Sequence, residues 1–74
     1  MGITEDLVDA LAVDVIAAMD EMGDERFHER VSKVLLDLSP TTQEAFMMSM
    51  RVRLAERRGR KFLAEQLEKF RAGT

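Results

Sequence analysis

The 74-residue chain contains no cysteine, tryptophan or tyrosine, and only one histidine and one proline. Without cysteine no disulfide bond can form, and a single histidine gives no grouping typical of a structural zinc site. A chain this short buries only about 60% of its unfolded surface, so its hydrophobic core contributes little stability. Because disulfides and structural zinc are excluded, we expect oligomerisation to supplement that core.

Side chains suited to catalysis or to cofactor binding are few. The glycines are too scattered to form a phosphate-binding loop, since they stand at Gly2, Gly23, Gly59 and Gly73. No nucleophile, base and orienting group can be combined from the remaining residues, so we expect no enzyme activity and no cofactor. Glu25 and His28 match the Glu-x-x-His pair of di-iron helical bundles. No inward glutamate on another helix completes that site, and we expect no metal.

Long hydrophobic segments are also absent. The most apolar stretch, ALAVDVIAAM, is short and contains Asp14, so no segment is expected to span a bilayer. The first residues are acidic and lack the positively charged start of a secretory signal. The sequence therefore predicts a cytoplasmic protein without a membrane partner.

Charge is distributed unevenly along a chain whose net charge is −3. Residues 1–25 hold eight acidic side chains and no basic one, a net charge of −8. The remaining residues hold eleven basic and six acidic side chains, a net charge of +5. Such a division predicts that the two halves attract each other, within one fold or between two copies, or that either half contacts another molecule.

Helical periodicity predicts an all-α fold, a single helical domain over residues 1–74. The first helix, about 5–22, is expected to start after an N-cap at Thr4 and to end at Gly23. The second, about 25–38, is expected to follow an N-cap at Asp24. Its apolar residues form one narrow stripe, with Ser32 on the polar side: Phe27, Val31, Val34, Leu35 and Leu38. The short connection between these helices predicts an antiparallel hairpin.

The third helix is expected over residues 40–72, with Ser39 as N-cap and Pro40 at its first position. At 33 residues it would be about 50 Å long and would extend past the other two helices. Gly59 is its only interruption, so a kink there, or a separate fourth helix, is an alternative to one continuous helix.

This third helix carries two apolar stripes. One runs along most of its length and comprises Met48, Val52, Ala55, Gly59, Leu63 and Phe70, with Phe62 and Leu67 at its margins. The other occupies the opposite face of the first half and comprises Phe46, Met47, Met50 and Leu54. A hairpin packed on one side can cover only one stripe. We therefore expect a second packing layer, most simply a homodimer, or a different protein partner.

We predict that the second stripe and the basic segment 51–61 form a protein-binding surface: Phe46, Met47, Met50, Leu54, Arg51, Arg53, Arg57, Arg58, Arg60 and Lys61. The chain would then be a small adaptor, inhibitor or assembly factor, with the arginines attracting an acidic partner. Two alternatives are a plain solvated face and a nucleic-acid contact through residues 51–61. The overall acidity and the lack of tyrosine and tryptophan for base stacking weigh against nucleic acid.

Overall fold

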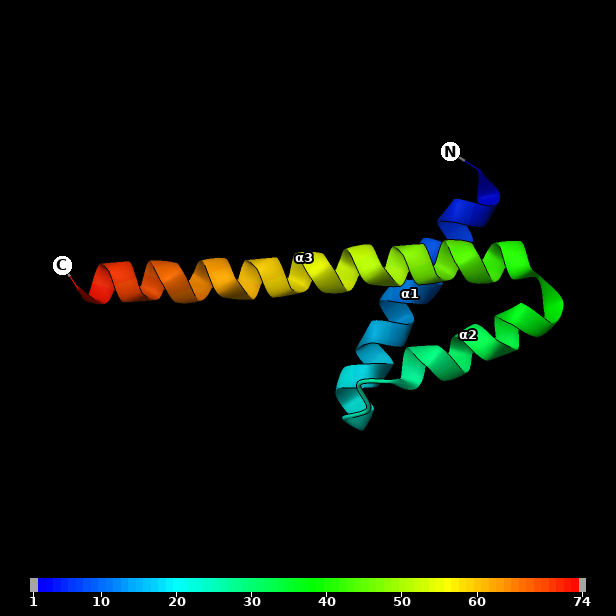
Figure 1. Ribbon diagram of the computed structural model, residues 1–74, viewed down its shortest axis with the longest axis horizontal. Coiled ribbons are helices and arrows are strands. Elements are labelled where there is room, and N and C mark those ends of the chain that lie inside the picture. The colour runs from blue at the N-terminus through cyan, green and yellow to red at the C-terminus, as the bar shows by residue number, and fades with distance from the viewer. Residues whose placement is uncertain (1, 74) are drawn as a thin grey trace.

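The computed structural model describes residues 2–73, which fold into three helices without any strand: α1 (Ile3–Met22), α2 (Phe27–Leu38) and α3 (Pro40–Ala72) (Figure 1). Both α1 and α2 pack mainly on the first half of α3. The second half of α3 extends past them, and we call residues 58–73 the arm and the remainder the head. Across residues 2–73, no helix combines the length and the apolar character needed to cross a membrane.

Local signals account for the bounds of α1. Ile3 is its first residue and Gly2 its N-cap, and the Gly2 amide donates a 2.5 Å hydrogen bond to the Glu5 carboxylate. The predicted cap at Thr4 was therefore wrong by two residues, because Glu5 reaches back to the preceding turn. Gly23 ends α1 as predicted, in the left-handed conformation at φ +66°, and the Asp24 amide donates to the Met19 carbonyl oxygen.

The starts of α2 and α3 depend on short polar side chains. Asp24 Oδ1 accepts a 3.0 Å hydrogen bond from the Arg26 amide, which forms a turn, and α2 begins at Phe27 rather than at the predicted residue 25. Ser39 Oγ accepts a 3.1 Å hydrogen bond from the Thr42 amide, and Pro40 is the first residue of α3. The predicted N-cap and proline position of α3 are confirmed.

The buried core lies between α1 and α3. Its members are Val8, Ala12, Val15 and Met19 of α1 and Phe46 and Met50 of α3. From α2, only Phe27, Val31 and Leu35 pack against this core, and they are partly buried. The expected antiparallel hairpin of the first two helices is not confirmed, because α1 and α2 diverge from the turn that joins them (Figure 1).

The rotation of α2 differs from the sequence prediction. Ser32, expected on the polar side, is buried and its Oγ accepts a 2.8 Å hydrogen bond from Gln43 Nε2 of α3. Val34 and Leu38, expected in the core, are 62% and 85% exposed. In this orientation α2 places Ser32 against α3, and only one edge of its apolar stripe, Phe27, Val31 and Leu35, meets the core.

The whole of α3 is one continuous helix through Gly59, so no fourth helix forms within residues 2–73. The extended arm makes the chain 55 Å long and gives it a radius of gyration of 15.6 Å, against about 11 Å for a compact chain of this length. Its accessible surface is 5979 Å², whereas a compact monomer of this mass exposes about 4,600 Å². The chain thus exposes about 1,400 Å² more than a globular monomer would.

Candidate protein-binding surface

The structure places the predicted apolar set of binding residues on the inner side of α3. Phe46 and Met50 are 0% and 1% exposed, and Met47 and Leu54 are partly buried against the same core. The expectation that these four residues form an exposed surface therefore does not hold. From Phe46 to Leu54 this stripe is only about 12 Å long, a length that α1 and α2 can cover.

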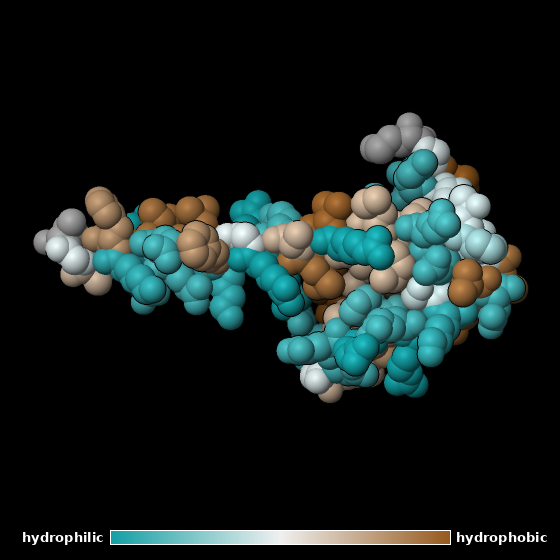
Figure 2. All heavy atoms as spheres, in the orientation of Figure 1, coloured by the Kyte–Doolittle hydropathy of each residue, from teal (hydrophilic) through white to brown (hydrophobic). Residues whose placement is uncertain are grey.

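The exposed apolar surface of α3 is the other stripe, which points away from the core. We define this α3 stripe as Met48, Val52, Ala55, Gly59, Phe62, Leu63, Leu67 and Phe70. Its large side chains are between 39% and 69% exposed. From Met48 to Phe70 it is about 33 Å long. Figure 2 shows apolar residues along one edge of the arm and hydrophilic ones along the other.

The composition of α3 changes at the point where the head ends. In the head, α3 is apolar on both faces. In the arm, the face that continues the core side carries charged residues such as Lys61 and Glu68, and only the α3 stripe is apolar. The arm is therefore a single amphipathic helix with its apolar face in contact with solvent. Large apolar side chains gathered on one exposed helix face are typical of binding surfaces.

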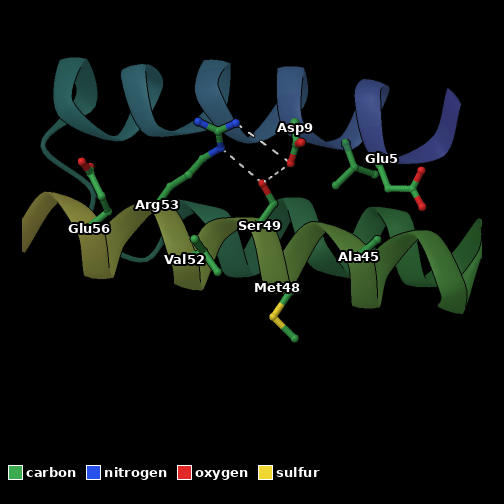
Figure 3. Close-up of a pocket in the computed structure, with 9 residues that line it drawn as sticks. Glu5, Asp9, Ala45, Met48, Ser49, Val52, Arg53 and Glu56 are labelled. Carbon is green, nitrogen blue, oxygen red and sulfur yellow. Dashed lines mark hydrogen bonds and ion pairs between the residues drawn. The ribbon is translucent and has the colours of Figure 1, made fainter. Parts of the chain in front are cut away.

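At the head, the α3 stripe borders an open groove between α1 and α3. Val8, Ala45, Met48 and Val52 give the groove an apolar lining. Three acidic residues stand around it: Glu5 and Asp9 from α1, and Glu56 from α3 (Figure 3). The groove therefore presents an apolar surface with a mainly acidic margin.

Polar contacts join the two helices along this groove. Ser49 Oγ of α3 donates a 2.7 Å hydrogen bond to Asp9 Oδ1 of α1 and accepts one of 3.3 Å from Arg53 Nε (Figure 3). The Arg53 guanidinium also lies 4.0 Å from Asp9 Oδ1. Met48 points away from α1 in the same view, which leaves its side chain open to a binding partner.

Half of the predicted basic segment is already engaged within the chain. Arg57 donates to both carboxylate oxygens of Asp20 at 2.8 Å, and this pairing raises the pKa of Arg57 above its ordinary value. Arg53 meets Asp9 as described, and Arg60 pairs with Glu56 one turn earlier. The attraction predicted between the acidic first helix and the basic third helix thus occurs within one chain at two positions.

The other half of the basic segment faces solvent. Arg51, Arg58 and Lys61 are exposed and form no ion pair with any residue between 2 and 73. Arg51 and Arg58 flank one edge of the α3 stripe, so an apolar partner seated on the stripe would meet positive charge beside it.

Within the described chain, no three histidine or carboxylate side chains gather closely enough to hold a metal ion. No protein-family model matches the chain, and comparisons with curated proteins and with solved structures gave no match. Inference about function therefore depends on the surface itself.

Sequence reasoning identified both stripes but expected the wrong one to be exposed. The signal that could have separated them is length. A stripe of about 12 Å fits beneath a 20-residue and a 12-residue helix, whereas a stripe of about 33 Å exceeds what two helices crossing α3 can cover. The longer stripe was therefore the one to remain exposed.

Proposed function

We propose that this chain is a small, non-enzymatic protein-interaction module, an adaptor, inhibitor or assembly factor, that binds through the α3 stripe. One observation carries the proposal: an apolar surface about 33 Å long stays uncovered on a helix whose opposite face closes the core. An exposed apolar stripe costs solubility and favours aggregation, so its presence is best explained by a partner that buries it.

The residues of the stripe suit a helical partner. Phe62 and Phe70 supply aromatic side chains, which are enriched in protein interfaces relative to the rest of the surface. Leu63, Leu67 and Phe70 follow the i, i+4, i+7 pattern by which one amphipathic helix recognises another. Arg51 and Arg58, exposed beside the stripe, would speed association with an acidic surface and help to exclude basic ones.

Nucleic-acid binding is the weaker candidate because carboxylates of this chain already pair with half of the basic side chains that would contact phosphates. Arg53, Arg57 and Arg60 are paired with Asp9, Asp20 and Glu56. Only three residues of the predicted basic segment stay open to phosphate oxygens, which would give a weak and strongly salt-dependent affinity. The acidic margin of the groove would repel a phosphate backbone further.

A matched pair of variants tests the proposed function. Leu63 and Ala64 are adjacent and exposed in the arm, but only Leu63 belongs to the α3 stripe. In a pull-down with a tagged, nuclease-treated sample, Leu63→Glu should lose the bound protein and Ala64→Glu should retain it. Equal retention by both variants, or loss of the bound material on nuclease treatment alone, would contradict the proposal.

The cytoplasmic location stays a prediction, which fractionation of cells expressing the tagged chain would check.

A further inference from the structure

Two pairs of residues in the α3 stripe are placed symmetrically about Gly59. Met48 and Phe70 each lie eleven residues from Gly59, and Ala55 and Leu63 each lie four residues from it. If two copies of α3 pack antiparallel with Gly59 at the centre, Met48 of one copy faces Phe70 of the second copy. Ala55 likewise faces Leu63 of the second copy. A small residue then opposes a large one at the Ala55–Leu63 level, and glycine opposes glycine at the centre, where the two backbones can approach closely.

Gly59 itself has no evident role within one chain. It lies inside α3, its φ is not positive, and a Cβ built there would meet nothing within 4 Å. Glycine is unfavourable in a helix interior, so some contact should compensate for it. Close approach of a second helix backbone is such a contact, because a side chain at the crossing point would hold the two helices apart.

Charge favours the antiparallel orientation. The groove at the Met48 end of the stripe has Glu5, Asp9 and Glu56 at its margin. The last turn of α3, at the opposite end, carries Lys69 and Arg71 beside Phe70, after Glu65 and Glu68 in the preceding turn. Antiparallel packing brings the last-turn bases of one copy towards the acidic groove of the second copy, whereas parallel packing brings the two acidic grooves together.

A second charge relationship agrees with that orientation. Arg51 and Glu65 lie on the same edge of the stripe, on opposite sides of Gly59. In the antiparallel pair, Glu65 of one copy falls within a turn of Arg51 of the second copy, and the two-fold symmetry repeats the contact.

The exposed area is sufficient for such an interface. Each chain exposes about 1,400 Å² more than a compact monomer of its mass, and a standard stable interface buries about 800 Å² per partner. In an antiparallel pair, each arm would cover the groove on the head of the second copy. Such an interface would bury most of the excess exposed area.

We propose that the α3 stripe binds the α3 stripe of a second copy of this chain, as an antiparallel, two-fold symmetric helix pair centred on Gly59. The inference rests on the proposed function, since it names the partner of the same surface. The arm of each copy lies in the acidic groove of the other, and the interface is isologous.

Sedimentation equilibrium tests the association. At about 100 µM, where even a weak interface forms, the wild type and Ala64→Glu should have twice the monomer mass of 8.4 kDa. Leu63→Glu should weaken the dimer at least roughly tenfold, because it places a carboxylate inside an apolar contact. A monomeric wild type, or a Leu63→Glu variant as dimeric as the wild type, would overturn the inference.

Cysteine pairing tests the register, and the chain contains no native cysteine to interfere. Gly59→Cys should form a disulfide with itself even though its side chain weakens the helix contact, because only residues near the two-fold axis approach within about 7 Å of their own copies and the covalent bond traps the dimers that form. Leu63→Cys should pair with Ala55→Cys when the two proteins are mixed, but not with itself. Ala64→Cys, on the far face, should pair with neither. Self-pairing of Leu63→Cys as fast as that of Gly59→Cys would indicate parallel helices and overturn the register.

Failure of this inference is distinguishable from failure of the proposed function. If the wild type is monomeric but retains a different protein that Leu63→Glu loses, the second copy is excluded and the interaction module stands. If Leu63→Glu changes neither the mass nor the captured proteins, both fail.

Discussion

Arg57 of α3 donates hydrogen bonds at 2.8 Å to both carboxylate oxygens of Asp20 in α1, a residue 37 positions earlier in the sequence. The pair joins the last turn of α1 to α3 at the point where α3 leaves the head. All of residues 58–73 beyond it are exposed. This contact therefore marks the boundary between the packed head and the arm that carries most of the proposed binding surface.

The Asp20–Arg57 pair should contribute only modestly to stability, because both side chains are more than half exposed. We expect Asp20→Asn to lower the urea midpoint slightly at low salt. The difference from wild type should shrink at about 1 M NaCl, where the Debye length falls to about 3 Å. Glu21→Gln removes the same charge from the neighbouring position, which forms no ion pair within residues 2–73, and serves as the control. A salt-independent difference would argue against an electrostatic contribution.

Two phenylalanines of α3 should respond very differently to truncation. Phe46 is 0% exposed in the core and Phe62 is 63% exposed on the α3 stripe. Phe46→Ala should lower the free energy of unfolding by about 3–5 kcal/mol, and Phe62→Ala should change that of the monomer by less than about 0.5 kcal/mol. Urea titrations followed by circular dichroism, at concentrations low enough for monomers, measure both. If Phe46→Ala does not fold, Phe46→Leu supplies the milder comparison. Equal losses at the two positions would contradict the assignment of faces.

Gly59 gives a prediction that separates helix stability from association. Gly59→Ala should stabilise the helix locally by up to about 1 kcal/mol, because a Cβ meets no neighbour within the chain. Slower amide hydrogen exchange around residue 59 in the monomer would show this. Ala64→Gly, in the same exposed arm, should have the opposite effect. The same Gly59→Ala substitution should weaken the dimer, and a variant that is both more helical and more tightly dimeric would argue against close approach at Gly59.

The start of α2 provides a pH-dependent contact. Arg26 Nε donates a 2.6 Å hydrogen bond to Glu29 Oε2, and this bond lowers the pKa of the Glu29 carboxyl below its ordinary value. A folded-state pKa below the unfolded one means that the contact stabilises α2 above the unfolded pKa. Its contribution is lost as the pH falls through the folded pKa.

Arg26→Gln should therefore raise the pKa of Glu29 towards its ordinary value. An NMR titration of the Glu29 side-chain carboxyl in both proteins measures the change directly. Lys33→Gln removes a lesser cause of the same lowering and should move the pKa of Glu29 less. An unchanged titration in Arg26→Gln would show that the pair does not persist in solution.

The sequence by itself determined the all-α class and most helix boundaries, because those depend on local interactions. Gly23 ends α1 through a left-handed conformation, and Ser39 with Pro40 starts α3 through a side-chain cap. The two errors in helix starts also came from short-range contacts. The Gly2 amide donates to Glu5, so α1 begins before Thr4, and the Arg26 amide donates to Asp24, so α2 begins only at Phe27. The dimer and the protein partner inferred from the two-sided apolar pattern of α3 stay predictions.

Only the tertiary structure decided which face of each helix is covered. Periodicity groups residues onto a face, but the neighbour that covers that face depends on how helices distant in sequence cross. On α3, the head covers Phe46 and Met50 and leaves Met48 and Val52 exposed. On α2, the packing of Phe27, Val31 and Leu35 and the hydrogen bond between Ser32 and Gln43 occur in a rotation that the apolar stripe alone did not predict. The core and the surface of this protein thus follow from contacts between helices, whereas the helices themselves follow from their own residues.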